Sequence, residues 1–536
     1  MPCISCYCPV YESKTRVLFA VAGEMVVRDC STVYPDLKTW NKAIKRRMQE
    51  GNVKQCLSAF VSMRENGFYP DNFTFPILFE AATRRSLVCL GYALHGQAFK
   101  CGYSHDLYVQ TCLLNMYSSF KDVDSAYKVF QDMQVKDVIA WNSMLDAYTS
   151  NGQIEEATEL FESAPLKDAT SFNIMISGYA KSGQLELGRA LFDAAPARDA
   201  ASWNSMILGC TLAGRMEDAR TLFDKVPKKN IVTWNTMVTG YLQNELFVDA
   251  IQVFEQMRAE NFKCDRVTIS SVLAACAHLG SIECGTALHV YTLENDLVGP
   301  EVTTSLIDMY AKCGCINQCV HVFYKSRVKD LFCWNAVISA LAFNDRGHAA
   351  LKIFDAMNNN KSLRPDDITF IALLSACAHS GLVQEGCSIF SSMKKYGISP
   401  KVEHYGCMVD LLGKANLVSQ AYEVVKSMPY NPGKRILGAL LSACVIHQDR
   451  EVGRKVIGRM MDRAEKMSDG EFMMASNLHA TCGDWEEAAT WRQRMSDEGI
   501  VKSAGCSVIQ LHGTTRRFVA GDRLGLIVGV SVLPVE

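Results

Sequence analysis

The sequence predicts an all-α solenoid of stacked helix–turn–helix repeats that begins near residue 37. Three observations predict it. The phrase Asp-x-x-x-Trp-Asn recurs along the chain, and asparagines 142, 173, 204 and 235 are spaced 31 residues apart. Each interval between them reads as two short amphipathic helices. One such helical hairpin cannot bury its own apolar face but stacked hairpins can, so a repeat of this length favours a solenoid over separate globular domains.

Residues 169–199 illustrate the two helices of a unit. The segment SFNIMISGYAKSG carries apolar residues at helical spacing and ends at Gly183, a residue type that stops helices. The segment QLELGRALFDAAP that follows is amphipathic again and is terminated by Pro196. A helix of about 12 residues is roughly 18 Å long, so each unit is predicted to be a compact hairpin.

Composition narrows the classes of function. The 55 Lys+Arg nearly balance the 57 Asp+Glu, so the net charge of −2 gives no overall signature of nucleic-acid or membrane binding. The apolar stretch from Leu524 to Val535 contains Pro534 and is too short to span a bilayer. The 22 cysteines are scattered, which favours reduced thiols inside a cell over a disulfide framework. We therefore expect a soluble, intracellular protein with no membrane partner.

The repeats carry the phrases V-x-W-N-x-M-I, Y-A-K-S-G and A-x-x-L-F in units of 31 to 36 residues. With these phrases the chain resembles the plant pentatricopeptide repeat proteins, and specifically the subfamily that mixes standard, long and short units. The resemblance implies a right-handed superhelical solenoid. We divide the array into about twelve units: 37–71, 72–106, 107–137, 138–168, 169–199, 200–230, 231–265, 266–299, 300–330, 331–366, 367–401 and 402–433.

The segments on either side of the array are distinct. GALLSACVIH and GDWEEAATWRQRM, within 434–500, resemble the E-type extension of this subfamily, and FVAGDR, within 501–523, resembles its E+ segment. Residues 524–536 form an atypical tail. Residues 1–36 mix basic and acidic side chains, whereas transit peptides are poor in acids, so they only weakly indicate organellar targeting. Leu437 and Val508 replace tryptophans that are usual in the extension.

The resemblance implies that each repeat reads one base of a single-stranded RNA through two side chains. The first reader is the fifth residue of a unit and the second reader is its last residue. Asn or Thr bonds the Watson–Crick edge of the base, while the neighbouring Asp orients that side chain and accepts from a base donor. The pairs are Asn41/Asp71, Thr111/Asp137, Asn142/Asp168, Asn173/Asp199, Asn204/Asn230, Asn235/Asp265, Thr304/Asp330 and Asn335/Asp366.

The family's rule assigns U to Asn with Asp, G to Thr with Asp, and C or U to Asn with Asn. Reading the units in order, it implies the target 5′-U-n-G-U-U-Y-U-n-G-U. Pro76, Ser270 and Ile371 occupy the fifth position of the long units, and Gly406 that of the last short unit, so these units are left open. In unit 300–330 the register allows either Thr304 or Ser305 as the reader.

Each of these residues also has a purely structural interpretation. An Asp or Asn before a helix is a common N-cap, and the tryptophans before the readers are expected in the interhelical core. However, a cap does not require a polar residue five positions downstream in eight units, so the array favours base reading. Lys181, Lys312 and Lys414 are thirteenth in their units and are candidates for phosphate contact, with a solvated surface lysine as an equal alternative. The near-neutral charge implies a moderate dependence of binding on salt.

No enzyme activity and no cofactor are expected. A zinc deaminase needs His-x-Glu and Pro-Cys-x-x-Cys, and none of the 11 histidines has Glu two residues on. Three Cys/His pairs resemble metal ligands, but they lie in different units and are too far apart to share one zinc. We expect these cysteines at helix–helix contacts. The pairs are Cys276/His278, Cys377/His379 and Cys444/His447.

Three hypotheses of function follow. In the first, the array binds single-stranded organellar RNA and selects a cytidine for C-to-U editing, while residues 434–523 recruit a DYW-type cytidine deaminase and other editing factors in trans. The resemblance implies the mitochondrion, with the chloroplast as the alternative. In the second, the same array serves RNA splicing, stabilisation or translation. In the third, the chain is a protein-binding helical-repeat scaffold.

Overall fold

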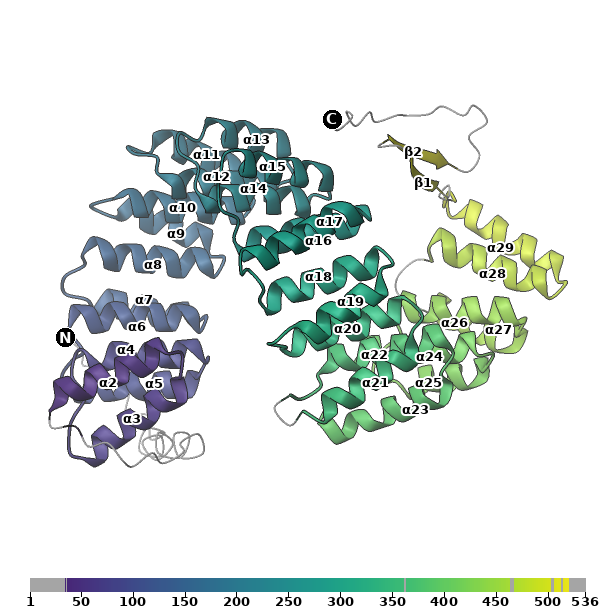
Figure 1. Ribbon diagram of the computed structural model, residues 1–536, viewed down its shortest axis with the longest axis horizontal. Coiled ribbons are helices and arrows are strands. Elements are labelled where there is room, and N and C mark those ends of the chain that lie inside the picture. The colour runs from purple at the N-terminus through teal and green to yellow at the C-terminus, as the bar shows by residue number, and fades with distance from the viewer. Residues whose placement is uncertain are drawn as a thin grey trace. The chain divides into compact units, whose positions relative to one another are not determined.

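The computed structural model describes residues 34, 36–360, 363–462, 467–502, 506–511 and 514–519. The chain divides into two compact units, Met1–Val272 and Leu273–Glu536. Figure 1 shows that each unit is a stack of antiparallel helix pairs. Within the described ranges, none of the helices is both long and apolar enough to cross a bilayer.

The first unit contains seven helix pairs among its described residues. In each pair the first helix packs against the first helix of the next pair, as α8 does on α10 and α10 on α12. The pairs are α2 (Leu37–Gln49) and α3 (Val53–Glu65), α4 (Thr74–Arg84) and α5 (Val88–Lys100), α6 (Leu107–Ser119) and α7 (Val123–Asp132), α8 (Val138–Ser150) and α9 (Ile154–Ser163), α10 (Ala169–Lys181) and α11 (Leu185–Ala194), α12 (Ala200–Leu212) and α13 (Met216–Lys225), and α14 (Ile231–Gln243) and α15 (Phe247–Ala259). Helix α16 (Arg266–Leu279) begins in the first unit and ends in the second.

The second unit continues the same architecture, and α18, α20, α22, α24, α26 and α28 stack in that order. Its helices are α17 (Ile282–Glu294), α18 (Pro300–Lys312), α19 (Ile316–Lys325), α20 (Leu331–Phe343), α21 (Gly347–Asn358), α22 (Asp367–Ser380), α23 (Val383–Ser392) with the 3₁₀ turn η1 (Met393–Tyr396), α24 (Val402–Lys414), α25 (Val418–Ser427), α26 (Lys434–His447), α27 (Arg450–Met461), α28 (Asp469–Thr481) and α29 (Trp485–Asp497). The predicted solenoid of helical hairpins is confirmed.

One element of the described chain departs from the all-α prediction. Strands β1 (Cys506–Leu511) and β2 (Thr514–Val519) pair in antiparallel register, with Cys506 opposite Val519. Both segments are rich in β-branched residues such as Val508, Ile509 and Thr514, which favour a pleated strand. The predicted tail 524–536, and residues 1–36 apart from 34 and 36, lie outside the described residues.

The aromatic residue before each asparagine reader packs against the core, as expected from the sequence. Trp234 is fully buried and packs edge-to-face on Phe223 of the preceding second helix, with ring centroids 4.9 Å apart. The same arrangement joins Phe130 to Trp141 at 5.0 Å. Such edge-to-face pairs add to the free energy of burial. A repeated aromatic contact therefore connects each of these pairs to the next.

Consecutive first helices of the middle repeats approach closely at the tenth residue of a unit. This residue is Gly178 in α10, Gly209 in α12 and Gly240 in α14. A Cβ added to Gly240 would lie 2.3 Å from Cγ2 of Thr211, and one added to Gly209 would lie 2.6 Å from Cβ of Ala180. Such contacts are shorter than van der Waals packing permits, so glycine is required for this spacing of the helices.

A buried histidine makes the stability of the second unit depend on pH. The Nδ1 atom of His404 accepts the backbone N–H of Lys401 at 3.0 Å, and its Nε2–H donates to the carbonyl oxygen of Asp367 at 3.1 Å. Burial lowers the pKa of His404 below its ordinary value of 6.5, although the nearby Asp367 opposes the shift. The neutral ring therefore stabilises the fold fully above pH 6.5, and this contribution is lost as the pH falls through the lowered folded-state pKa.

We expect the thermal midpoint of the full chain to fall between pH 7 and pH 5, and His404→Gln to reduce that fall. Burial also lowers the pKa of His95 and His289, so part of the dependence should persist in the variant. Circular dichroism melting at fixed ionic strength measures both chains. A midpoint of the natural chain that does not change over this window would contradict the prediction.

Candidate nucleic-acid interface

The predicted readers occupy equivalent places in the fold. Each first reader is the fifth residue of a first helix, as Asn142 is in α8 and Asn173 in α10. Most second readers directly precede the next first helix, as Asp168 precedes α10, whereas Asp71 lies three residues before α4. Thr304 is the fifth residue of α18, which makes it the equivalent of the other readers in place of Ser305. Each pair therefore lies in one unit, and its second member stands at or near the start of the next unit's first helix.

The structure joins both members of all five Asn/Asp pairs by hydrogen bonds. Nδ2 of each asparagine donates to the carboxylate at 3.0 to 3.1 Å. Burial raises the pKa of Asp168, Asp199 and Asp265, but the hydrogen bonds that these carboxylates accept outweigh it, and each pKa is lowered. These three carboxylates are therefore negatively charged at neutral pH and hold the asparagine amides in place. The pairs are Asn41/Asp71, Asn142/Asp168, Asn173/Asp199, Asn235/Asp265 and Asn335/Asp366.

A third side chain, which the sequence analysis missed, completes each of these five pairs. It is a Ser or Thr three residues after the aspartate, and its hydroxyl donates to Oδ1 of the asparagine at 2.6 to 2.7 Å. The same hydroxyl lies 2.7 to 3.0 Å from the carboxylate. The residues are Thr74, Ser171, Ser202, Thr268 and Thr369. The signal for them was present in the sequence, because Asp-x-x-Ser/Thr is the pattern of a capping box.

The second readers are also helix caps. Asp168 accepts the backbone N–H of Ser171 at 2.9 Å, and Asp366 accepts that of Thr369 at 2.9 Å. From the sequence alone, helix capping and pairing with a reader were competing interpretations of these aspartates. This opposition was wrong, since one carboxylate has enough lone pairs to accept the helix N–H and the asparagine amide together.

The structure does not join the two Thr/Asp pairs by hydrogen bonds within the described residues. Oγ1 of Thr111 donates to the carbonyl oxygen of Leu107 at 2.8 Å, and Oγ1 of Thr304 donates to that of Pro300 at 2.9 Å. Each threonine hydroxyl thus donates its only hydrogen to a carbonyl oxygen of its own helix. Both threonine readers are therefore held by their own helices, and Oγ1 of Thr304 also lies 3.4 Å from Sγ of Cys333 in the next repeat.

The partners of these threonines, Asp137 and Asp330, therefore require a correction. The family resemblance implied that each aspartate orients its reader, but Asp137 accepts the backbone N–H of Ala140 at 2.8 Å and Asp330 accepts that of Cys333 at 2.9 Å. These bonds cap α8 and α20, and neither carboxylate accepts from its threonine. The expected orienting role was wrong for Asp137 and Asp330, because the donor that an asparagine amide offers is missing. A base contact from either carboxylate stays a prediction.

The Asn204/Asn230 pair is different again, and no hydrogen bond joins its two members in the described part of the chain. The hydroxyl of Thr233 donates to Oδ1 of Asn230 at 2.9 Å. Oδ1 of Asn204 is buried and has no hydrogen-bond partner among the described residues. The amide of this reader is therefore not held in the way that the other asparagines are.

Exposed apolar side chains lie beside the readers, and the sequence analysis missed these too. They are the second residues of first helices, three positions before the fifth residue, which is a reader in four of these helices and Ser270 or Ile371 in the other two, so they share its helix face. Their exposed fractions are 52 to 66%, and a flat apolar surface next to a polar pair suits the stacking of a base. They are Tyr108, Ile139, Val232, Val267, Phe332 and Ile368.

The first repeats enclose a groove of about 1150 Å³ beside α2, α4 and α6. Its lining includes the pair Asn41/Asp71 and the exposed ring of Tyr108. Lys38, Lys42 and Lys45 line the same groove from one face of α2. These lysines concentrate positive charge locally in a chain whose net charge is only −2, which favours a polyanion at this end of the array.

The three lysines predicted to contact phosphate are exposed at the ends of α10, α18 and α24. Lys312 pairs with Asp308 at 2.9 Å, and Lys414 pairs with Asp410 at 2.8 Å. Because these aspartates offset their charge, Lys312 and Lys414 attract a phosphate less strongly than the lysines of α2. Lys181 has no ion pair within the described residues.

The cysteines of the three Cys/His pairs lie in the core. Cys276, Cys377 and Cys444 are fully buried, which confirms their expected place at helix contacts. Burial raises the pKa of Cys377 to about 11 and that of Cys444 to about 12, so both thiols are protonated at neutral pH. In the described part of the chain, no three His, Cys, Asp or Glu side chains are grouped so that they could hold a metal ion.

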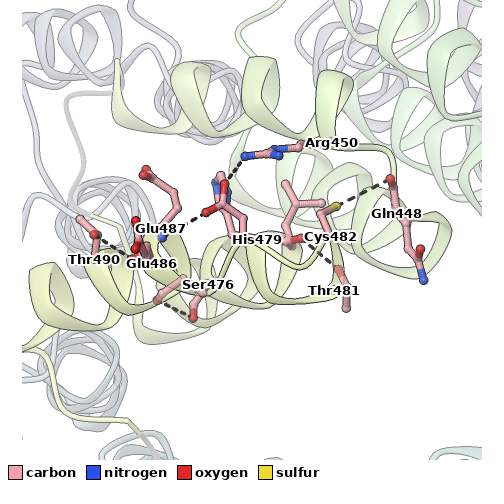
Figure 2. A network of polar contacts seen from close by, with 12 residues as sticks. Gln448, Arg450, Ser476, His479, Thr481, Cys482, Glu486, Glu487 and Thr490 are labelled. Atoms are coloured by element: carbon pink, nitrogen blue, oxygen red, sulfur yellow. Dashed lines mark hydrogen bonds and ion pairs between the residues drawn. The ribbon is translucent and has the colours of Figure 1, made fainter.

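The C-terminal helix pairs are connected by polar contacts of a different kind. Figure 2 shows Arg450, from α27, reaching toward the turn before α29, where it pairs with Asp484. Ser476 of α28 donates to the carbonyl oxygen of Ala488 at 2.9 Å and accepts from Arg492 at 3.1 Å. These contacts fix α27, α28 and α29 relative to one another. Trp485, at the start of α29, is 69% exposed.

Comparison with known proteins identifies the class of this chain. Profiles of the PPR repeat family match residues 35–84, 229–278 and 329–379. The profile of the E motif matches 447–510. A single PPR repeat profile matches seven further segments, which are 111–138, 139–165, 170–195, 201–231, 302–331, 368–398 and 403–431. The stacked hairpins and their repeated site thus define a helical-repeat protein.

Similar proteins from Arabidopsis thaliana place the chain within one family. It is 46% identical to pentatricopeptide repeat-containing protein At3g29230, over 91% of this chain and 82% of that protein. It is 28% identical to At1g31920, over 90% of this chain and 65% of that protein. It is 40% identical to the chloroplastic protein ELI1, over 49% of this chain and 42% of that protein. The chain belongs to the pentatricopeptide repeat family and carries its E motif, and it spans less than two thirds of two of these relatives.

The fold agrees with solved structures of the family. The crystal structure of PPR10 from maize superposes with a TM-score of 0.54 at 17% identity, over 91% of this chain and 77% of that chain. PPR10 in complex with an 18-nt psaJ RNA element gives a TM-score of 0.51 at 15% identity, over 91% of this chain and 83% of that chain.

Proposed function

We propose that this protein binds single-stranded RNA by sequence and selects a cytidine for C-to-U editing in a plant organelle. The observation that carries the proposal is the repeated Asn/Asp pair, which five repeats hold in the same hydrogen-bonded geometry. In three of these repeats an exposed apolar side chain, Ile139, Val232 or Phe332, precedes the reader by three positions. A protein-binding scaffold gives no reason to keep this pair at one register. A strand of bases with one repeat per base does give such a reason.

The chemistry of the pairs suits base edges. The amide of each paired asparagine keeps one N–H and one Oδ1 lone pair beyond the bonds that its neighbours take. The lysines of α2 provide a place for phosphates, and the exposed side chains at the second helix position provide surfaces for stacking. PPR10, whose fold is similar, forms a complex with an RNA element. The target that follows from the pairs is 5′-U-n-G-U-U-Y-U-n-G-U.

The proposed role in editing depends on the C-terminal segment. We assign residues 37–433 to RNA recognition and residues 434–523 to the recruitment in trans of a DYW-type cytidine deaminase and other editing factors. The E motif matched at 447–510 and the exposed Trp485 support a binding role for this segment. The chain itself acts as a non-catalytic recognition factor. We assign it to the mitochondrion, with the chloroplast as the alternative because one relative is named chloroplastic.

Binding of the purified full chain to UAGUUCUAGU, compared with a scrambled oligonucleotide at one salt concentration, tests the recognition step. We expect binding to the designed RNA to be at least about tenfold tighter, which corresponds to roughly 1.4 kcal/mol. Equal and weak binding to both would contradict RNA recognition and favour a protein scaffold.

Sequencing of organellar transcripts from plants that lack the protein tests the editing step. We expect one or more cytidines downstream of a matching site to stay unedited. Unspliced or truncated transcripts with normal editing would instead support the alternative role in splicing, stabilisation or translation.

A further inference from the structure

We propose that the Ser or Thr three residues after each paired aspartate is a positioning residue that makes the asparagine reader select U over C. This inference rests on the proposed RNA recognition and deepens it. It assigns a third specificity residue to each of the five repeats with an Asn/Asp pair, contributed by the following repeat.

The hydroxyl is part of a closed set of hydrogen bonds with one direction. In the unit of Asn142, the backbone N–H of Asp168 donates to Oγ of Ser171 at 3.2 Å, and Oγ–H donates to Oδ1 of Asn142 at 2.7 Å. Nδ2 of Asn142 then donates to the carboxylate of Asp168 at 3.0 Å. Rotating the amide by half a turn would place Oδ1 against the carboxylate and turn Nδ2 toward the hydroxyl, which would then keep only the carboxylate, at 3.0 Å, as an acceptor. The arrangement therefore fixes which end of the amide faces the aspartate.

The direction of the amide matters because uracil and cytosine differ in the order of their edge groups. Uracil presents an acceptor at position 4 beside a donor at position 3, whereas cytosine presents a donor at position 4 beside an acceptor at position 3. In a given pose, U places its acceptor at position 4 against the amide N–H and its donor at position 3 against Oδ1. In the same pose, C would need the amide N–H and Oδ1 in exchanged places. A reader that cannot rotate its amide therefore distinguishes the two bases, and a reader that can rotate accepts both.

In all eight units, the residue at the place of this hydroxyl agrees with the type of reader that it faces. All six asparagine readers face a repeat with Ser or Thr at this place, and both threonine readers face Ala140 or Cys333. The one asparagine whose amide is not held by the hydroxyl is Asn204, because Thr233 donates to Asn230 instead. This is the unit for which C and U are both expected. The geometry thus accounts for U in five units and for either pyrimidine in the sixth.

The variants Ser171→Ala and Thr233→Ala test the proposal as a matched pair. Both remove the capping-box hydroxyl from the third residue of a first helix, so both lose the same capping contact, and only Ser171→Ala also loses a bond to a reader. We expect Ser171→Ala to reduce the preference for U over C at the fourth base of UAGUUCUAGU by about three- to tenfold, as loss of one hydrogen bond implies. Thr233→Ala should leave the tolerance of the sixth base for C and U unchanged. Ser171→Thr should keep the preference of the natural chain.

Fluorescence anisotropy with oligonucleotides that differ only at base four or base six measures these preferences, and circular dichroism melting confirms folding. A natural chain that prefers U at base four, together with a Ser171→Ala chain that keeps the whole preference, would overturn this inference alone. A natural chain with no base preference at any position would overturn the proposed function itself. A loss of affinity equal for U and C would assign the hydroxyl to folding only.

Discussion

Replacing Asn173 by threonine is expected to change the base preferred at the fifth position of UAGUUCUAGU from U to G. The substitution reproduces the reader of the units that contain Thr111 and Thr304, where the hydroxyl donates to the carbonyl oxygen four residues earlier. The amide N–H that now donates to Asp199 would be lost, and the carboxylate would be free to accept from a base donor. We expect a preference of about tenfold for U to become one of similar size for G, since each direct contact contributes about 1 kcal/mol.

Four oligonucleotides that differ only at the fifth base measure this change, with the third base as an internal control that should stay G. The double variant Asn173→Thr with Ser202→Ala should complete the switch, because the hydroxyl of Ser202 otherwise lies 2.9 Å from the carboxylate of Asp199 and competes for it. A single variant that still prefers U at the fifth base would contradict the assignment of Asn173 as a reader.

Replacing Trp234 by alanine is expected to destabilise the first unit by about 3 to 5 kcal/mol, as truncation of a large core aromatic does. The indole is fully buried between Phe223, at 4.9 Å, and Phe262, at 5.7 Å. Its Nε1 atom has no hydrogen-bond partner among the described residues, so the loss is one of packing. Because each repeat contacts only its neighbours, unfolding should begin in the repeats around α14.

Urea denaturation of the full chain measures the loss, and hydrogen exchange identifies the repeats that open first. Trp485→Ala is the matched control, since that indole is 69% exposed and its removal should change stability by less than about 0.5 kcal/mol. Similar effects of the two substitutions would show that Trp234 does not carry the packing described above.

The helices and their stacking could be predicted because the same residue types recur at a fixed spacing along the chain. An aromatic residue every 31 residues (Trp141, Phe172, Trp203 and Trp234), a turn at a residue such as Gly183 and a stop at Pro196 are visible in one sequence. The strand pair β1 and β2 was not predicted, because two strands of six residues lie outside the repeat and have no period to compare.

The sequence predicted which residues form the candidate site but not all of the contacts between them. The reader pairs follow from spacing together with the family resemblance, whereas their contacts depend on side-chain orientation across two repeats. Ser171 lies 29 residues after Asn142 and belongs to another repeat, so its hydroxyl looks like an ordinary cap until the helices are stacked. For the same reason the sequence did not reveal that Asp137 and Asp330 cap a helix without holding a reader. The lysines of α2 were missed because the sequence analysis considered the total charge, which conceals a local cluster.

The glycines at the tenth position of the middle repeats have a consequence for how an RNA strand is measured. Gly178, Gly209 and Gly240 set the distance between neighbouring first helices, and the readers are carried on those same helices. The step from one reader to the next is therefore determined by residues on which no base rests. A change at one reader alters the recognition of one base, whereas a change at one of these glycines shifts all readers on one side of it relative to those on the other side. The readers therefore determine which bases are recognised, and these glycines determine the spacing at which they are recognised.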